Sequence, residues 1–152
     1  MGVLKTLNVG LGDRSYPIFI GTDLGSEIER ISAKYLHQGK KVVSIVDRGL
    51  TEAAPSFAKD FLDSVPTLSL PSGETTKSIN FLSQVWDFLA QKGVDRTGVL
   101  FTMGGGVSGD LAGFAAASYL RGIDFYQVPT TLLAMVDSSV GGKTGINLSA
   151  GK

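Results

Sequence analysis

The junction between an apolar run, TGVLFTM (97–103), and the glycine-rich stretch MGGGVSGDLAG (103–113) most constrains what this chain can fold into. The apolar run has the length and composition of a buried strand, and we expect a helix from Asp110. Between them, Gly104, Gly106 and Gly109 fit the G-x-G-x-x-G spacing. A buried strand that passes through glycines into a helix leaves backbone amides open at the helix N-terminus, where anions bind. The junction therefore predicts an α/β domain with a candidate anion-binding turn.

The rest of the chain alternates strand and helix patterns, as expected for a parallel sheet covered on both faces. Apolar residues at helical spacing, such as Leu24, Ile28, Ile31 and Tyr35, mark the first helix, and Gly93 is placed to end the third. We therefore expect an α/β fold with a Rossmann-like parallel sheet and helices on both faces. The predicted strands are 5–11, 16–21, 41–47, 66–71, 97–103 and 124–130, and the predicted helices are 24–38, 51–65, 78–93, one from 110, and 132–140.

Composition limits the class of protein further. With 152 residues, 43% of them hydrophobic, the chain is long enough for one globular domain, residues 1–152. Lys+Arg and Asp+Glu both number 14, which argues against nucleic acid or an anionic membrane as a partner. The sequence has no cysteine, which excludes disulfides and thiolate metal sites and suits a cytoplasmic protein. No signal peptide or membrane-length apolar run is present, so we expect a soluble chain.

The glycine turn alone leaves two interpretations open, a nucleotide site and a glycine-rich bend. In a standard dinucleotide fold this turn follows the first strand, and an acidic residue ends the next strand. Here the turn follows several strand and helix units, and no acidic residue ends the next strand. Asp110, directly after the glycines, would repel a pyrophosphate if it pointed inward. We therefore expect Asp110 to face away or to turn toward a hydroxyl or a lysine.

A second stretch, VPTTLLAMVDSSVGGKTGIN (128–147), concentrates polar residues in an apolar and glycine-rich region. Together with GGGVSGDLAGFAAASYLRG (104–122), it resembles the 3-dehydroquinate synthase family. PSGETTKS (71–78) resembles the family's Asp-Gly-Glu-x-x-Lys segment, with Ser72 in place of the acid. The resemblance runs from about Val42 to the last residue, and it implies the N-terminal domain of a two-domain fold.

The resemblance implies a lyase of the shikimate pathway, which leads to the aromatic amino acids. The family converts 3-deoxy-arabino-heptulosonate 7-phosphate into 3-dehydroquinate and phosphate. Its cofactors are NAD, which is reduced and reoxidised in each turnover, and a divalent metal, zinc or cobalt. The partners implied are a small sugar phosphate and a second subunit in a homodimer.

Carried over residue by residue, the resemblance implies a set of NAD contacts. Asp47 resembles the ribose-side acid, although it could be an ordinary turn residue after a strand. Thr130 and Thr131 resemble hydroxyl contacts to the cofactor, and capping of the next helix is compatible with that role. For Glu74 and Lys77 the alternative is a helix N-terminal acid with a solvated lysine. The full predicted cofactor set is Asp47, Ser72, Gly73, Glu74, Lys77, Gly105, Gly106, Val107, Ser108, Gly109, Asp110, Thr130, Thr131, Asp137, Lys143 and Lys152.

The resemblance also implies a substrate side. Asp137 and Lys143 resemble residues where cofactor and substrate meet; a simple salt bridge between them is the alternative. Arg121 resembles an arginine that reaches the substrate phosphate of a neighbouring subunit, although a cation at the end of a helix would also fit. The predicted catalytic set is Lys143, Asp137, Asn147, Lys152 and Arg121.

No metal ligand is predicted in this chain. The single histidine, His37, lies at a predicted helix end and is expected at the surface. In the family the ligands, one glutamate and two histidines, come from a helical C-terminal domain that this sequence does not include. We therefore expect the chain to be the NAD-binding half of the enzyme and inactive alone.

Two alternatives stay open from the sequence. The first is another sugar-phosphate cyclase, although the segments around Asp110 and VDSSVGGKT argue against it. The second is a non-catalytic nucleotide-binding module. Iron-type alcohol dehydrogenases share the glycine turn but not the segments that follow it.

Overall fold

The computed structural model describes residues 2–151 and contains a four-stranded parallel sheet. Its strands are β3 (Val42–Asp47), β4 (Thr67–Leu70), β5 (Val99–Gly104) and β6 (Asp124–Pro129), in the order β4-β3-β5-β6. All three pairings are parallel, with Val42 beside Val99 in the central pair. The predicted parallel sheet is confirmed.

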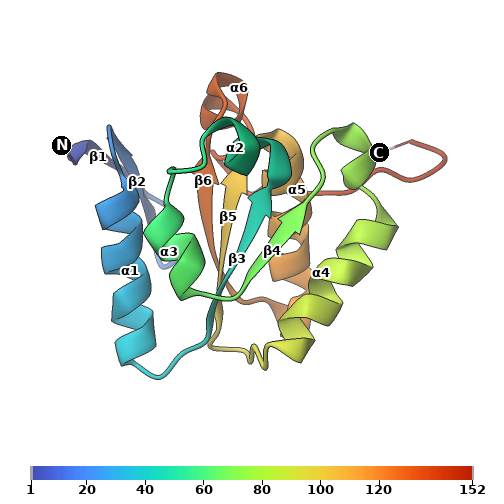
Figure 1. Cartoon of the computed structure of the whole chain (residues 1–152), viewed down its shortest axis with the longest axis horizontal. Helices are drawn as coiled ribbons and strands as arrows, with labels where there is room; N and C mark the ends of the chain where they lie inside the picture. The colour runs from blue at the N-terminus through green and yellow to red at the C-terminus, as the bar shows by residue number, and fades with distance from the viewer. Residues whose placement is uncertain (1, 152) are drawn as a thin grey trace.

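Helices cover both faces of this sheet, as predicted (Figure 1). The helices α1 (Gly25–His37) and α3 (Lys59–Ser64) pack on one face. The helices α4 (Ile79–Gln91) and α5 (Gly106–Ser118) pack on the other. The fold is therefore a three-layer α/β arrangement.

The two central strands are buried on both sides, which explains their continuous apolar sequences. On β3, Val43 and Ile45 face the layer of α4 and α5, whereas Val42 and Val46 face the layer of α1 and α3. The strand β5 is buried at every position. Because both faces exclude water, side chains that bind a polar ligand can lie only at the strand ends.

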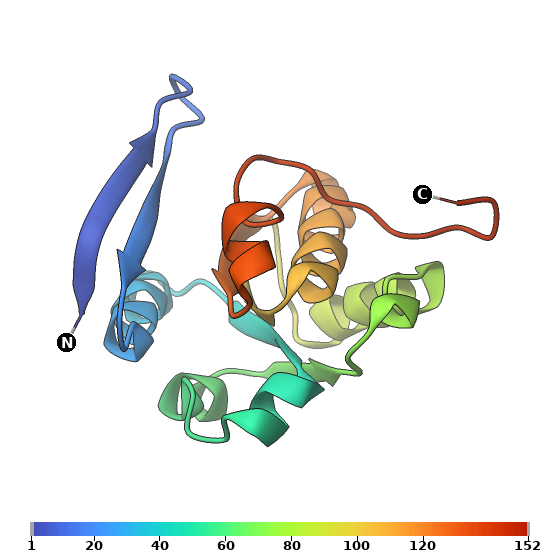
Figure 2. The same ribbon diagram turned by 90° about the horizontal axis from the view of Figure 1, so that it is seen from above.

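The first two predicted strands form but do not join this sheet. The strands β1 (Val3–Val9) and β2 (Tyr16–Gly21) make a separate antiparallel hairpin. The hairpin stands beside the three-layer body, next to α1 (Figure 2). Most of β1 is exposed.

The second predicted helix, residues 51–65, is wrong as a single element. The structure breaks it into α2 (Arg48–Ala53) and α3, with turns between them. Pro55 has no N–H for a helical hydrogen bond. Ala58 adopts a φ of 48°, in the left-handed region, which ends any continuous helix.

Two further helix boundaries differ from the sequence prediction. The helix α5 begins at Gly106, four residues before Asp110, so Gly106 and Gly109 belong to its first turns. The helix α6 (Leu132–Val136) ends before the predicted limit at residue 140. Short 3₁₀ turns, η1 (Glu74–Thr76) and η2 (Tyr119–Arg121), flank the helices α4 and α5.

Close packing explains why glycines are used inside α5. A Cβ added at Gly109 would lie 1.9 Å from the side-chain nitrogen of Gln127 on β6. One added at Gly113 would lie 2.4 Å from the methyl of Thr144. These two glycines therefore let β6 and the last segment of the chain approach the helix backbone. No helix within residues 2–151 has the length and apolarity that crossing a bilayer requires.

Candidate functional site

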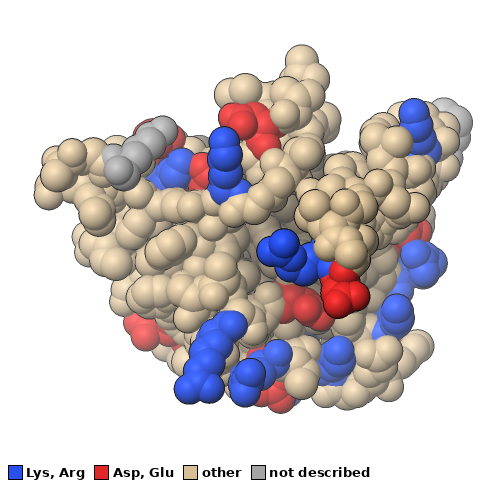
Figure 3. Space-filling view, turned by 180° about the vertical axis from the view of Figure 1, so that it is seen from behind, with Lys and Arg blue, Asp and Glu red and all other residues tan. Residues whose placement is uncertain are grey.

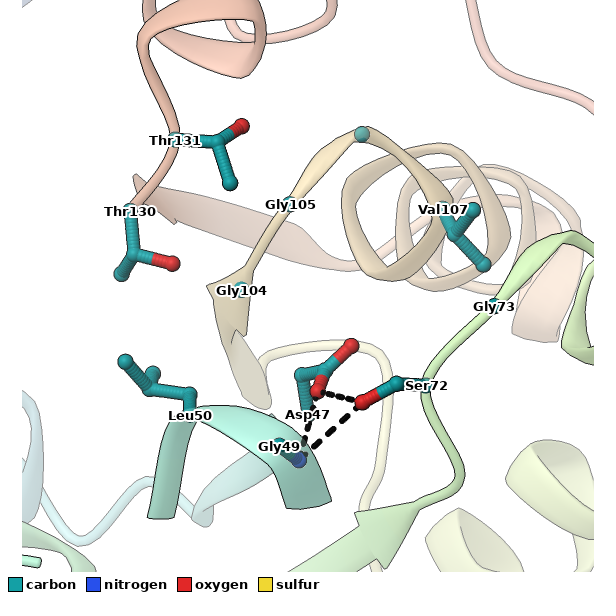
Figure 4. A pocket seen from close by; sticks show the side chains of 11 residues that line it. Asp47, Gly49, Leu50, Ser72, Gly73, Gly104, Gly105, Val107, Thr130 and Thr131 are labelled. Carbon is teal, nitrogen blue, oxygen red and sulfur yellow. Dashed lines mark hydrogen bonds between the residues drawn. The ribbon is translucent and has the colours of Figure 1, made fainter. Parts of the chain in front are cut away.

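A cleft of about 360 Å³ lies at the carboxyl ends of the sheet strands, beside the start of α5 (Figure 4). The chain passes from β3 to β4 on one side and then to β5 on the other, so the strand order reverses between β3 and β5. Open α/β sheets bind ligands at this kind of position. The cleft is lined by Asp47, Gly49, Leu50, Ser72, Gly73, Gly104, Gly105, Gly106, Val107, Thr130 and Thr131.

The N-terminus of α5 forms one wall of this cleft. No side chain caps this helix end, so its first amides are available to a ligand. The N-terminus of a helix attracts anions through these amides and through the helix dipole. The wall can therefore hold a phosphate group.

Gly105 and Gly106 leave space that the protein itself does not use. A Cβ added at Gly105 would have its nearest neighbour at 3.5 Å, and one added at Gly106 at 3.6 Å, both ordinary contacts. Gly105 has an ordinary φ of −82°, and Gly106 is not among the glycines with positive φ. Neither packing nor backbone conformation requires glycine here, and both residues line the cleft. The space that they leave open is available to a ligand.

Asp47 lies at the floor of the cleft, where β3 ends. Its Oδ1 accepts a hydrogen bond from the Gly49 amide at 2.8 Å and another from the Ser72 hydroxyl. Asp47 therefore caps α2 and also faces the cleft, so the two sequence interpretations are compatible. Figure 4 shows its other carboxylate oxygen directed away from these two partners.

Thr130 and Thr131 line the side of the cleft opposite Asp47 and Ser72 (Figure 4). The hydroxyl of Thr131 accepts a hydrogen bond from the Ala134 amide at 3.2 Å and caps α6. The expected capping role is thus confirmed for Thr131, and it leaves the hydroxyl at the wall of the cleft.

A second cleft, of about 240 Å³, also borders the start of α5 and shares Gly106 and Val107 with the first. Charged and apolar side chains both contribute to its walls. It is lined by Glu74, Lys77, Gly106, Val107, Asp110, Leu133, Ala134, Asp137 and Ser138. Both clefts therefore border the N-terminus of this helix.

Lys77 and Asp110 form an ion pair at this second cleft. Their side chains are only 10% and 21% exposed, so the pair is shielded from water. Asp110 therefore turns toward a lysine, one of the predicted arrangements. The alternative of a solvated Lys77 is wrong, because this residue is 8% exposed.

Several predicted site residues line neither cleft. Ser108 and Gly109 are buried beneath the glycine turn. Asn147 instead hydrogen-bonds to the side chain of Glu74 and the backbone of Lys77. Lys152 lies outside the described residues.

Lys143 is exposed, and the ion pairs among the described residues do not include a bridge from it to Asp137. Arg121 lies in η2, just after the C-terminal end of α5. Because α5 starts at the carboxyl ends of the strands, Arg121 is at the opposite end of the sheet from the clefts. Its role at a neighbouring subunit stays a prediction.

Gly49, Leu50 and Gly104 line the first cleft but were absent from the predicted set. The position of Gly49 has a sequence signal, because an Asp at a strand end commonly binds the amide two residues later. Leu50 follows from the same turn, and no comparable signal identifies Gly104 beyond its place in the glycine stretch.

On the face of the molecule that Figure 3 shows, acidic and basic side chains are interspersed. Within residues 2–151, His, Cys, Asp and Glu form no group of three or more that could hold a metal ion. His37 lies exposed at the end of α1, as expected.

The fold and the clefts define an open α/β protein with an uncapped helix N-terminus, of the kind that can bind anions, at the switch point of its sheet. The family model for the 3-dehydroquinate synthase N-terminal region matches residues 67–152. This chain belongs to the 3-dehydroquinate synthase family.

Curated relatives support this assignment along the whole chain. A 3-dehydroquinate synthase of Opitutus terrae is 53% identical over 148 residues, which cover 97% of this chain and 41% of that protein. One from Rhodopirellula baltica is 48% identical, covering 98% of this chain and 42% of that protein. The chain therefore spans about two fifths of the length of these relatives.

Solved structures show the same fold in sugar-phosphate cyclases. A 2-deoxy-scyllo-inosose synthase, complexed with carbaglucose-6-phosphate, NAD⁺ and Co²⁺, matches with a TM-score of 0.79 and 26% identity. The match covers 97% of this chain and 41% of that one. A 2-epi-5-epi-valiolone synthase from Streptomyces hygroscopicus, with NAD⁺ and Zn²⁺ bound, matches with a TM-score of 0.63 and 28% identity over 74% of this chain and 33% of that one.

Proposed function

We propose that residues 1–152 are the NAD-binding domain of a 3-dehydroquinate synthase. In that enzyme 3-deoxy-arabino-heptulosonate 7-phosphate is converted into 3-dehydroquinate and phosphate. The observation that carries the proposal is the unused space at Gly105 and Gly106, beside uncapped amides of α5. The 53% identity to a 3-dehydroquinate synthase, against 26% to the inosose synthase, favours this cyclase over the others.

The residues of the first cleft fit NAD. The amides at the start of α5 suit the pyrophosphate, because they are uncapped and face open space. The second oxygen of the Asp47 carboxylate suits the hydroxyls of a ribose. Thr130 and Thr131 supply hydroxyls on the opposite wall. When bound, NAD supplies a temporary hydride acceptor for an alcohol of the substrate.

The second cleft is the proposed boundary between cofactor and substrate. Glu74, Lys77, Asp110 and Asp137 contribute charged groups there, which suit a polar, hydroxylated ligand. We also propose substrate-side roles for Lys143, Lys152 and Arg121, the last in a homodimer. The described residues do not fit the divalent metal, so we propose that it is bound by the part of the family's enzymes that this chain does not span.

Because half of the site would then lie elsewhere, the 152-residue chain is proposed to be inactive alone and to bind NAD weakly. The proposed location of the enzyme is the cytoplasm, in keeping with a sequence that has no cysteine.

Replacing Gly106 with alanine tests the NAD site with a matched control. Gly106 and Gly25 are both the first residues of helices, and a Cβ at Gly25 would have nothing within 4 Å. Alanine favours helix, so either substitution should leave the free energy of unfolding unchanged or raise it by up to about 1 kcal/mol. Only Gly106→Ala should raise the Kd for NAD, by about tenfold, because its methyl is added at a residue that lines both clefts.

Calorimetric or NMR titration of NAD into both variants measures this difference, and thermal unfolding checks their stability. Equal NAD affinity in wild type, Gly25→Ala and Gly106→Ala would contradict the proposed position of the cofactor.

A further inference from the structure

The last described segment of the chain is attached to the outside of the domain. After α6 it crosses α5 and continues toward α4 (Figure 2). Thr144 lies against Gly113 of α5, and Ile146 packs against the core beneath. These contacts bring Asn147 next to the turn that carries Glu74 and Lys77.

Asn147 binds this turn through both its backbone and its side chain. Its backbone amide donates to the Lys77 carbonyl at 2.8 Å, and a β-bridge pairs it with Ser78. Its side-chain nitrogen Nδ2 donates to Glu74 Oε1 at 2.7 Å. Asn147 is therefore joined to both ends of a short segment, Glu74 to Ser78, that lies about seventy residues earlier in the chain.

The orientation of the Asn147 amide is set by Glu74. A carboxylate only accepts hydrogen bonds, so the amide must turn its nitrogen toward Glu74. This leaves Asn147 Oδ1 buried and without a hydrogen-bond partner among the described residues. Burying an acceptor without a hydrogen-bond partner costs free energy. That Asn147 Oδ1 is nevertheless buried in this way indicates that the hydrogen bond to Glu74 outweighs the cost.

The hydrogen bond from Asn147 is important for the second cleft because Glu74 faces that cleft from an exposed turn. Glu74 belongs to the three-residue helix η1, and it is exposed. A long carboxylate side chain at such a position has several rotamers, and fixing one of them before a ligand arrives improves binding. Lys77, whose carbonyl Asn147 also binds, forms the ion pair with Asp110 in the same cleft.

We propose that Asn147 is a positioning residue, which holds the Glu74 carboxylate and the Lys77 backbone at the second cleft. It thereby couples the segment that follows Asp137 to the cofactor-facing turn. The proposal rests on the proposed NAD site, and it assigns Asn147 a role other than contact with substrate.

A donor–acceptor exchange tests this role. Asn147→Asp replaces the donor with a second carboxylate opposite Glu74 and keeps the backbone bond to Lys77. In the wild-type background it should weaken NAD binding by about threefold to tenfold. In the Glu74→Gln background the amide can donate to the new carboxylate, so Asn147→Asp should change the affinity by less than about twofold. Ser149→Ala, an exposed neighbour on the same segment, should leave NAD affinity unchanged.

The readouts separate this proposal from the NAD site itself. The ¹³C signal of the Glu74 carboxyl should shift in Asn147→Ala and in Asn147→Asp but not in Ser149→Ala, whether or not NAD binds. A Glu74 signal that does not respond to either Asn147 variant would overturn the proposal. So would equal losses of NAD affinity from Asn147→Asp in the two Glu74 backgrounds. If the wild-type chain binds no NAD, the NAD site fails and the carboxyl signal decides the role of Asn147.

Discussion

Lys77→Met is expected to lower the free energy of unfolding by about 3 kcal/mol. Lys77 forms an ion pair with Asp110, and their side chains are 10% and 21% exposed. Methionine has a similar length but no charge, so Asp110 would stay largely buried without its cation. Loss of one partner of a buried pair typically costs about 3–5 kcal/mol, and the residual exposure of Asp110 favours the lower end.

A double-mutant cycle separates the charge interaction from packing. Lys77→Met with Asp110→Asn should be more stable than the sum of the two single losses predicts, by at least about 1 kcal/mol. The control is Lys59→Met, which breaks an ion pair with Asp63 whose side chains are 60% and 63% exposed. Exposed pairs contribute little, so chemical denaturation of this variant should match wild type. Additive losses in the cycle would show that Lys77 stabilises the domain by packing alone.

Gly104→Ala is expected to have an effect of similar or larger size, about 2–6 kcal/mol of lost stability. Gly104 has a φ of 154°, a conformation that residues with a side chain rarely adopt. An added Cβ would also lie 2.9 Å from the Cβ of Asp47 and 2.8 Å from the Ser108 hydroxyl. Strain and overpacking each contribute about 1–3 kcal/mol. The displaced Asp47 should also weaken NAD binding.

The neighbouring Gly105→Ala is the matched control for this prediction. Its nearest contact would be 3.5 Å, and its φ is ordinary. We therefore expect its free energy of unfolding to stay within about 1 kcal/mol of wild type. Urea denaturation of both variants provides the comparison. Equal stability of the two variants would contradict the prediction that the positive φ and the close contacts of Gly104 require glycine there.

The elements that the sequence predicted well are those in which the spacing of apolar residues directly reflects which side chains are buried. The runs 41–47 and 97–103 are apolar because both of their faces are covered, and both form central strands. The helix at 78–93 shows a helical spacing of buried residues such as Leu82, Val85 and Leu89. In these segments the local pattern and the tertiary environment agree.

The start of α5 was misplaced because local preference and tertiary packing disagree. Glycine has a low helix propensity, so a stretch from Gly104 to Gly109 resembles a loop. In the structure the helix already begins at Gly106, and Gly109 is needed for contact with Gln127. That contact joins α5 to β6, eighteen residues later in the chain, and a local sequence pattern cannot predict it.

Most residues that line the two clefts were among those that the sequence singled out, but the bonds between them were not predicted. Asp47, the glycine turn and Thr130 follow strand ends, and the parallel sheet brings strand ends to one edge. The bond between Asn147 and Glu74 depends on the path of the chain after α6, which passes over α5. Such long-range side-chain pairs are decided by the assembled fold, so the sequence alone did not identify this bond.

The most direct test of the NAD site is a titration of NAD into the ¹⁵N-labelled chain, followed by amide NMR signals. If the cofactor binds as proposed, saturable shifts should concentrate at Gly105, Gly106 and Val107 and at the turn from Asp47 to Leu50. The hairpin of β1 and β2, which lies apart from the clefts, should be unaffected. No saturable shifts in a folded chain, or shifts centred on that hairpin, would contradict the proposed NAD site.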